Sequence, residues 1–559
     1  MEPASGATLI ATGMLPFLVL VSAALTAPVS IALLALYRHA VLKSMAASGA
    51  AAQPAPLASA DGTAPPKAKL RVTDVSASTI AASPTRNAAT TSLRRAVAIY
   101  VGAGFVYALV LAGAWMVLAR DGGFPLLRFL WLLSCYAWPT VLAVGLLAAV
   151  TRRQRAMLAA LYFALVCALA VVGLARNGEL TAGQLAGFWL LTNAPATLLL
   201  LAFLHRRVRA VGPLVLAFAV CAITGSQVAV SLVGESETAM RAAVESGGVL
   251  GLGGTGTFFA LMGVGALVAA ALGWKSLQWL GRRYRERRTS DQALTLDAMW
   301  LLFGVVQSIG FAFDGILWVL TGLISFAAYK GATRLGFTLA GLGHAHGTSP
   351  SLLLLRVFAL GARSERLFDA LTKRWLRVGD ISLIAGPDLA TTTVEPHEFL
   401  DFVGGHLSRQ FVRDDADLAR RLKQRAIGPD PDGRHRVNEF FCHTDTWQPA
   451  MRLLAATADA VLMDLRSFST SNQGCQYELQ QLLNTVPLQR VVFLIDATTD
   501  RAFLDDTLQH LWQKLDPQSP NRAATTPTVR LLALGGGGDP ALTPLLDLLY
   551  AALERPATA

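Results

Sequence analysis

The residues whose types suit chemistry lie in the last third of this 559-residue chain. Asp464 and Arg466 follow a short apolar run, and Glu478 stands near the start of a segment with helical composition. A carboxylate at the start of a helix can act in catalysis, but it can also only complement the helix dipole. Gly386 and Pro387 end a second apolar run and predict a tight turn there.

Other patterns in the same region carry less information. His344 and His346 have metal-ligand character but no third ligand nearby, so we expect a flexible joint rather than a metal site. The glycines from Gly535 to Gly538 could cradle a phosphate through backbone N–H groups, although a plain loop is the simpler explanation. The sequence has no Ser-His-Asp order, Cys-x-x-Cys pair or Walker lysine.

Short apolar runs separated by helical segments would position these residues. The runs have the length and composition of buried strands, and they are Leu352–Phe358, Asp380–Ala385, Val461–Asp464, Val491–Ile495 and Val529–Ala533. Strands that alternate with helices predict a parallel, doubly wound α/β sheet. Ligands of such sheets bind beyond the carboxyl ends of the strands, where the strand order reverses. Gly386, Pro387, Asp464 and Arg466 are therefore candidate cofactor-binding residues.

The order of these elements is similar to that of bacterial Toll/interleukin-receptor (TIR) domains, which have a flavodoxin-like fold. The matching pieces include Ile384-Ala-Gly386-Pro387 after the second strand and the helix from Trp447 that leads into Val461-Leu-Met-Asp464-Leu-Arg466. Gly474-Cys475-Gln-Tyr-Glu478-Leu479 resembles the Trp-Cys-x-x-Glu signature of the family, with Gly474 in place of the Trp. The loop after the first strand departs from the family pattern.

The resemblance implies one of two kinds of activity. Some TIR domains cleave the N-glycosidic bond of NAD with the glutamate of that signature, which here is Glu478. NAD would then be a substrate, and the carboxylate would stabilise the developing oxocarbenium charge. Other TIR domains act by self-assembly or partner binding, often through the loop that here contains Gly386. The resemblance also suggests a homo-oligomer and a role in prokaryotic signalling, such as defence against phage.

The first 330 or so residues differ from the tail, because they carry about nine apolar runs of nearly 20 residues each. A helix needs roughly 20 apolar residues to cross the hydrocarbon of a bilayer. The predicted spans are Leu9–Tyr37, Ala96–Ala119, Pro125–Val150, Met157–Leu174, Leu185–Leu204, Val211–Val233, Val249–Trp274, Leu294–Gly310 and Phe313–Tyr329. The segment from Gly310 to Gly315 suggests that the last two form a hairpin.

The net charge of +11 comes from short loops beside these runs, whereas the tail has about as many acids as bases. Nucleic acid is therefore not an expected partner. Lys and Arg gather on every second loop, and such loops mark the cytoplasmic side. We expect a multi-pass protein of the inner (plasma) membrane, with its N-terminus outside and its C-terminal domain in the cytoplasm.

The predicted division of the chain follows from these patterns. It comprises a first transmembrane helix at 1–43, a disordered Ala/Pro/Ser/Thr-rich linker at 44–92, a helical bundle at 93–334, a joint at 335–350 and a TIR-like domain at 351–559. A transporter or channel with a regulatory tail is the alternative from another class. Polar residues within spans, such as Asn193, Ser226 and Gln307, could line a pathway or hold helices together.

Overall fold

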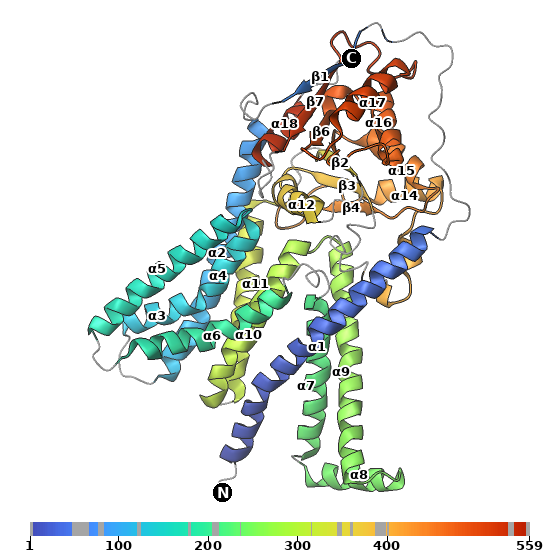
Figure 1. Cartoon of the computed structure of the whole chain (residues 1–559). Helices are drawn as coiled ribbons and strands as arrows, with labels where there is room; N and C mark the ends of the chain where they lie inside the picture. Colours follow the sequence, from blue (N-terminus) through green and yellow to red (C-terminus); the bar gives the residue numbers. More distant parts are fainter. Residues whose placement is uncertain are drawn as a thin grey trace.

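The structure is a computed structural model. It describes residues 4–46, 66, 68–75, 83–119, 125–176, 180–203, 212–234, 236–314, 316–343, 349–357, 362–385, 399, 402–534 and 542–554. The chain forms a long helical half and an α/β domain that lies at one end of it (Figure 1). The N-terminus lies at the end of the helical half away from the α/β domain.

Eleven α-helices build the helical half within the described residues. They are α1 (Ala4–Ala46), α2 (Pro84–Leu118), α3 (Leu126–Tyr136), α4 (Trp138–Leu147), α5 (Arg152–Arg176), α6 (Ala182–Phe203), α7 (Gly212–Gly234), α8 (Glu237–Val249), α9 (Gly254–Arg285), α10 (Asp291–Ser308) and α11 (Leu320–Ala340). The short helix α8 lies across the ends of α7 and α9, far from the α/β domain (Figure 1).

Seven helical stretches among the described residues are long and apolar enough to cross a membrane. They correspond to the first five predicted spans and to the seventh and eighth, with α3 and α4 forming one stretch. The other two predicted spans coincide with α7 and, from Leu320 onward, with α11. The expected count of nine spans stays a prediction.

Helices α10 and α11 run antiparallel, as the predicted hairpin requires. The Asp297 carboxylate near the start of α10 lies 2.5 Å from Lys330 Nζ in α11. Further along, Gly304 and Gly322 face each other so closely that a Cβ on Gly304 would lie 2.9 Å from the Gly322 carbonyl oxygen. Two 3-10 turns, Ile309–Asp314 and Ile316–Val319, reverse the chain between the helices.

Small residues also explain the contact between α7 and α9. Gly225 and Ala229 of α7 lie against Gly265 and Ala269 of α9, each pair spaced four residues apart. A Cβ on Gly265 would lie 2.5 Å from both the Ala229 Cβ and the Gly225 carbonyl oxygen. In a membrane, where lipid tails are as apolar as leucine, such small-residue contacts are a main source of helix association.

The helical half has two packing groups. One core includes α2 to α6 with α10 and α11, and its large, fully buried side chains include Trp300, Tyr107 and Phe303. A second, smaller core joins α1, α7 and α9 to the α/β domain through residues such as Tyr37 and Phe411. The α/β domain therefore packs on both groups of helices.

The α/β domain contains a seven-stranded sheet in which all pairs are parallel. Its strands are β1 (Arg71–Asp74), β2 (Ser351–Arg356), β3 (Asp380–Ile384), β4 (Val437–Phe440), β5 (Ala460–Asp464), β6 (Val491–Ile495) and β7 (Thr528–Ala533). The order is β1-β7-β6-β5-β2-β3-β4. The five predicted strands take the 2-1-3-4-5 order of flavodoxin-type sheets, and β4 extends it to the 3-2-1-4-5-6 order of dinucleotide-binding folds.

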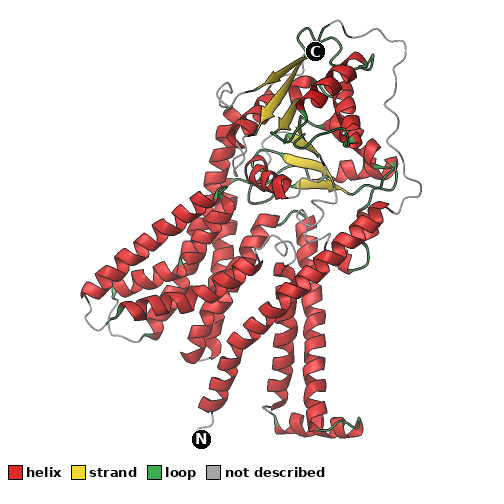
Figure 2. Ribbon diagram, viewed as in Figure 1, coloured by secondary structure: helices red, strands yellow, loops and turns green. Residues whose placement is uncertain are grey.

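Helices cover both faces of this sheet (Figure 2). Leucines of α12 (Ala362–Trp375) and α18 (Leu542–Glu554) pack on one face, together with Ala89 of α2. The other face packs against α14 (Asp415–Gln424), α15 (Trp447–Thr457), α16 (Gln473–Thr485) and α17 (Arg501–Gln513). The sequence-based prediction of a helical region followed by a doubly wound α/β domain is confirmed.

The predicted linker at 44–92 is wrong in two places. Arg71–Asp74 forms the edge strand β1, because Leu70 is buried in the core of the sheet and Val72 packs beside it. Helix α2 begins at Pro84, where Ser83 caps it by accepting a hydrogen bond from the Thr85 N–H. The average composition of residues 44–92 reveals neither the strand nor the start of the helix. Residues 47–65 of the linker lie outside the described residues.

Candidate functional site

The strand order reverses between β2 and β5, in the centre of the sheet. From β2 the chain leads to β3 on one side, whereas from β5 it leads to β6 on the other. The carboxyl ends of β2 and β5 lie in register, so that Arg356 is the partner of Asp464. A ligand of a doubly wound sheet binds at such a reversal. The predicted site residue Asp464 therefore lies at the switch point.

Asp464 and Arg466 form a buried ion pair at this point. The Arg466 guanidinium donates from Nε to Asp464 Oδ1 at 2.8 Å and from Nη2 to Oδ2 at 2.6 Å. The exposed fractions are 1% for Asp464 and 5% for Arg466. The next residue, Ser467, adopts a φ of +62°, a left-handed conformation that is uncommon for serine. The ion pair thus fixes a tight, strained turn after β5.

Glu478 lies in α16, where it experiences the charge of Arg356, the residue that is paired with Asp464 in the sheet. It is 4% exposed, and among the described residues its Oε2 atom has no hydrogen-bond partner. Burial raises the pKa of its carboxyl from 4.5 to about 8, although the charge of Arg356 opposes the change. As the sixth residue of α16, Glu478 is past the first turn, so complementing the helix dipole does not explain its position.

Together Arg356, Asp464, Arg466 and Glu478 form a set that we call the switch-point cluster. Because Glu478 is protonated at neutral pH, the cluster carries one net positive charge. A neutral carboxyl can donate a hydrogen bond, as can both arginines. The cluster therefore suits a ligand with hydrogen-bond acceptors or negative charge. Nearby, the Cys475 thiol packs 4.0 Å from the Arg356 carbonyl oxygen, and burial raises its pKa.

The structure does not test every predicted site residue. Gly386 and Pro387 lie outside the described residues, as do His344, His346 and Gly535–Gly538. Among the residues that are described, no group of three or more His, Cys, Asp or Glu side chains could hold a metal ion. Arg356 was missed from the sequence, where its only signal is a charge that ends an otherwise apolar strand.

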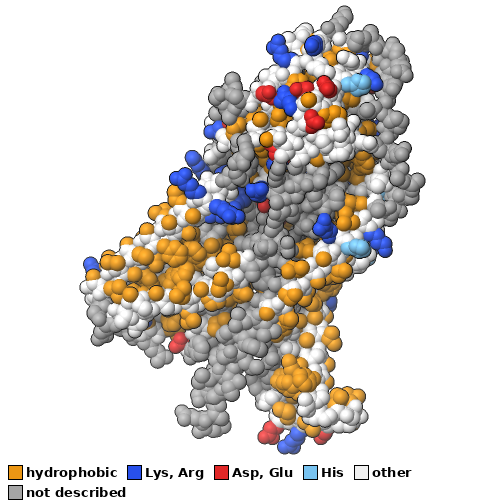
Figure 3. Space-filling view, viewed as in Figure 1, with side chains coloured by type: hydrophobic (Ala, Val, Ile, Leu, Met, Phe, Trp, Pro, Cys, Tyr) orange, Lys and Arg blue, Asp and Glu red, His pale blue; other side chains and the backbone are white. Residues whose placement is uncertain are grey.

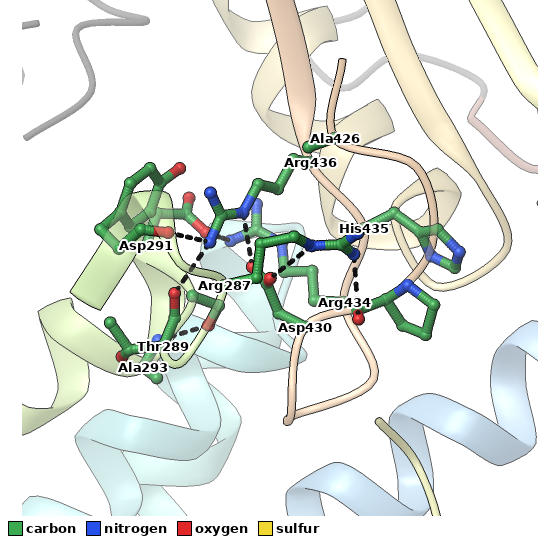
Figure 4. Close-up of polar contacts among 12 residues, drawn as sticks. Arg287, Thr289, Asp291, Ala293, Ala426, Asp430, Arg434, His435 and Arg436 are labelled. Atoms are coloured by element: carbon green, nitrogen blue, oxygen red, sulfur yellow. Dashed lines mark hydrogen bonds and ion pairs between the residues drawn. The ribbon is translucent and has the colours of Figure 1, made fainter. Parts of the chain in front are cut away.

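A second polar cluster connects the α/β domain to the helical half (Figure 4). It consists of the turn between α9 and α10 and the loop from Gly428 to Arg436, and we call it the polar joint. Arg287 donates to the carbonyl oxygens of residues 427, 428 and 429, and its Nε lies 3.6 Å from Asp430 Oδ1. Its φ of +59° lets the side chain point into the α/β domain directly after α9 ends.

Arg436 reaches in the opposite direction, from the α/β domain to α9. Its Nε donates to Asp430 Oδ2 at 2.8 Å, and its Nη2 donates to the Tyr284 carbonyl oxygen at 2.7 Å. The guanidinium also lies 4.0 Å from the centre of the Tyr284 ring. Burial raises the pKa of Asp430 to about 6, although Arg436 and Arg287 oppose this change. Asp430 is 1% exposed, so removing either arginine would leave its charge poorly compensated.

Two further contacts complete the joint. Ser290, the cap of α10, donates to Asp432 Oδ2 at 2.6 Å, and Arg434 lies 2.6 Å from Asp291 Oδ1. Arg377 from the turn after α12 donates to the Asp432 carbonyl oxygen at 2.7 Å. The joint therefore fixes the start of α10, the end of α9 and the loop that leads into β4 relative to one another.

The α/β domain also contacts α4 and α1. Lys373 of α12 donates to the Ala149 carbonyl oxygen at 2.8 Å, and Arg374 donates to that of Ala148 at 3.3 Å. These bases satisfy carbonyl groups at the C-terminus of α4 and complement its dipole. His443 Nδ1 lies 2.8 Å from the Ser44 carbonyl oxygen near the end of α1.

Within the helical half, two of the polar residues of the predicted spans, Asn193 and Gln307, contact each other, whereas Ser226 donates to the Ile223 carbonyl oxygen of its own helix. Gln307 Nε2 donates to Asn193 Oδ1 at 3.1 Å, and the Tyr107 hydroxyl donates to Gln307 Oε1 at 2.7 Å. Asn193 Nδ2 in turn donates to the Cys135 carbonyl oxygen beside the break between α3 and α4. These bonds link four helices, which favours their interpretation as helix-to-helix contacts rather than the lining of a pathway.

The chain matches no protein-family model, and comparisons with curated proteins and with solved structures give no match either.

Proposed function

We propose that this chain is a membrane-anchored signalling protein. The helical half spans the inner membrane with its N-terminus outside, and the TIR-like α/β domain signals in the cytoplasm by self-assembly or partner binding. Basic side chains support this orientation, because Arg152, Arg153 and Arg155 are exposed at the end of α5 nearest the α/β domain. Figure 3 has Lys and Arg side chains between the hydrophobic surface of the helices and the α/β domain.

The polar joint is the observation that carries this proposal. A domain that is merely tethered to a membrane needs only a flexible connection. Here two partly exposed ion pairs, Arg287–Asp430 and Arg434–Asp291, tie two transmembrane helices to the loop before β4. The buried Arg436 adds a link, because it pairs with Asp430 and donates to the Tyr284 carbonyl oxygen. A displacement of α9 relative to α10 would move Arg287 and Ser290 and, through Asp430 and Asp432, that loop. The helical half thus has a direct mechanical connection to the edge of the sheet.

Clustering the protein from the outer side tests the proposal. Full-length protein with an N-terminal biotin and donor or acceptor dyes at the C-terminus is reconstituted in liposomes, and streptavidin is added outside. We expect energy transfer between α/β domains to rise in the wild type and to rise much less in Arg287→Ala. The matched control is Arg288→Ala, because the Arg288 side chain is 66% exposed and, within the described part of the chain, forms its ion pair with the exposed neighbour Glu286. Equal responses of all three proteins would contradict the role of the joint, and no response in the wild type would contradict the function.

NAD cleavage is the second candidate, and Glu478 is the observation that favours it. Among the described residues, this buried carboxyl has an oxygen without a hydrogen-bond partner, and it lies at the switch point within reach of the positive charge of Arg356. Its raised pKa leaves only about a tenth of it ionised at pH 7, but a cationic nicotinamide or oxocarbenium group nearby would favour the ionised form.

Release of nicotinamide from NAD by the full-length protein, clustered as above, tests this candidate. Glu478→Gln should abolish the release, whereas Asp506→Asn, on the exposed side of α17, should leave it unchanged. If the clustered wild type releases no nicotinamide, the enzymatic function is refuted and the assembly function stands alone. If Glu478→Gln is as active as the wild type, Glu478 is not the catalytic residue.

A further inference from the structure

Strand β1 comes from outside the contiguous α/β domain. It lies between α1 and α2 in the chain, yet it pairs with β7 in parallel, with Val72 opposite Val529. Backbone bonds flank the pair, from the Arg71 N–H to the Pro527 carbonyl oxygen and from the Val75 N–H to that of Leu531. Without β1, the hydrogen-bonding edge of β7 would be open to another strand.

The contacts that hold β1 in place are few. The strand has four residues, of which three are exposed. Asp74 pairs with Arg501 at 2.7 Å, but both side chains are more than one third exposed, so this ion pair adds little stability. The firmest contacts precede the strand, where Leu70 is buried and the Trp512 indole N–H donates to the Ala68 carbonyl oxygen.

We propose that β1 is an exchangeable edge strand, and that the α/β domains of two copies assemble when β1 of one copy pairs with β7 of the other. The inference rests on the proposed assembly function and names its surface, the edge of β7. A second copy supplies a partner that is complementary by construction, because its β1 has the same sequence as the strand seated there. Exchange then needs no new contact.

The connection to α2 limits how far β1 can reach. Nine residues lie between the end of β1 at Asp74 and Pro84, and nine extended residues span at most about 32 Å. The start of α2 is held on α18, because Arg86 Nη1 lies 2.9 Å from Asp547 Oδ2 and Thr85 bonds to Glu554. Exchange is therefore possible only between neighbouring copies whose α18 faces lie close together, as clustering in one membrane would arrange them.

Cysteines in two differently tagged full-length copies test the exchange. One copy carries Val72→Cys and the other Val529→Cys, and the two are reconstituted together, clustered through their N-termini and oxidised. We expect a disulfide between chains, because these positions are paired in register only if β1 is exchanged. The matched control replaces Val529→Cys by Leu494→Cys, a buried position on β6 that β1 does not touch, and should give only background.

Two more variants keep the test interpretable. The double variant Val72→Cys/Val529→Cys should form a disulfide within one chain, which shows that the cysteines leave the fold intact, and it should no longer exchange. Thr73→Pro removes the N–H that alternation directs toward β7, so it should weaken the pairing of β1 with β7 of either copy. The yield of the disulfide between chains should therefore be several-fold lower with Thr73→Pro than with Thr73→Val.

The outcomes separate the two proposals. If clustered copies give energy transfer but no disulfide between Val72→Cys and Val529→Cys copies, the exchange is refuted and assembly stands. If clustering gives neither signal, both proposals are refuted. A disulfide yield as high with Leu494→Cys as with Val529→Cys also refutes the exchange, because it would reflect collision rather than pairing.

Discussion

Replacing Glu478 by glutamine should stabilise the protein, and the gain should depend on pH. The folded state holds the carboxyl with a pKa of about 8, against 4.5 when it is solvated. Below pH 4.5 the group is protonated in the folded and the unfolded state, so it has no effect. Between pH 4.5 and 8 only the unfolded chain releases the proton, and the free energy of unfolding falls as pH rises. Above pH 8 the loss is complete.

The size of this effect follows from the shift in pKa. One pKa unit corresponds to about 1.4 kcal/mol, so the loss is about 3 kcal/mol at pH 7 and about 5 kcal/mol above pH 8. Because Glu478 is only 4% exposed, solvent reduces this loss of stability very little. Glutamine has the same shape and no ionisable group. For a domain of this size, the midpoint of thermal unfolding of Glu478→Gln should exceed that of the wild type by roughly 6–12 °C at pH 7.

The assay is thermal unfolding of the full-length protein in detergent, followed by intrinsic fluorescence from pH 4.5 to pH 9. The difference between Glu478→Gln and the wild type should be near zero at the acid end and reach its plateau above pH 8. Asp506→Asn, which removes an exposed carboxylate from the same domain, should show no such rise. A difference that is equal at pH 5 and pH 8.5 would refute the reasoning, because burial of an ionising Glu478 would not be its source.

Three further predictions concern other parts of the molecule. Burial lowers the pKa of His435 to about 4, so the free energy of unfolding of the wild type should fall by about 3 kcal/mol as pH falls from 6.5 to 4. His435→Gln should not show this fall, and an equal fall in both proteins would contradict the prediction. Gly265→Ala should lower the thermal midpoint by the equivalent of about 1–3 kcal/mol, and Gly263→Ala, where a Cβ meets nothing within 4 Å, should leave it unchanged; similar effects of both would refute the small-residue contact. Asp464→Asn should cost about 3–5 kcal/mol in chemical unfolding, because Arg466 keeps its buried charge, and a loss below about 1 kcal/mol would show that the pair is not needed.

The sequence predicts the centre of the fold well because the central strands are buried on both faces. All six residues of β2 and all five of β3, β5 and β6 are buried, so each appears as a short, mostly apolar run, which in β3 is interrupted by Ser382. The edge strands lack this signal. The residues of β4 are mostly half-buried, and those of β1 mostly exposed, so neither differs from a loop in composition.

The candidate site is predictable only in part, for a similar reason. Asp464 and Arg466 stand at the end of a recognisable strand, and Glu478 stands in a motif. Arg356 becomes a site residue only through the register that places it beside Asp464. The polar joint brings together residues about 145 positions apart in the sequence, such as Arg287 and Asp430, so no local sequence pattern predicts it.

One break in the helical half has a local signal. The predicted span from Pro125 to Val150 is interrupted at Ala137, where α3 ends and α4 begins with Trp138 and Pro139. Proline lacks the N–H that would continue the hydrogen bonding of α3. The apolar run alone gives the length of a span, and the proline gives the position at which it breaks.

Strand β1 also imposes a condition on how the protein is synthesised. Arg71 leaves the ribosome 457 residues before Thr528, its partner on β7. At typical rates of translation, this separation corresponds to a delay of roughly 20–90 s, during which the remaining helices enter the membrane. Throughout that time the segment must neither insert into lipid nor pair with the nascent strands of other chains. Its short, charged sequence Arg-Val-Thr-Asp suits such a delay, and a longer or more apolar edge strand would make biogenesis prone to aggregation.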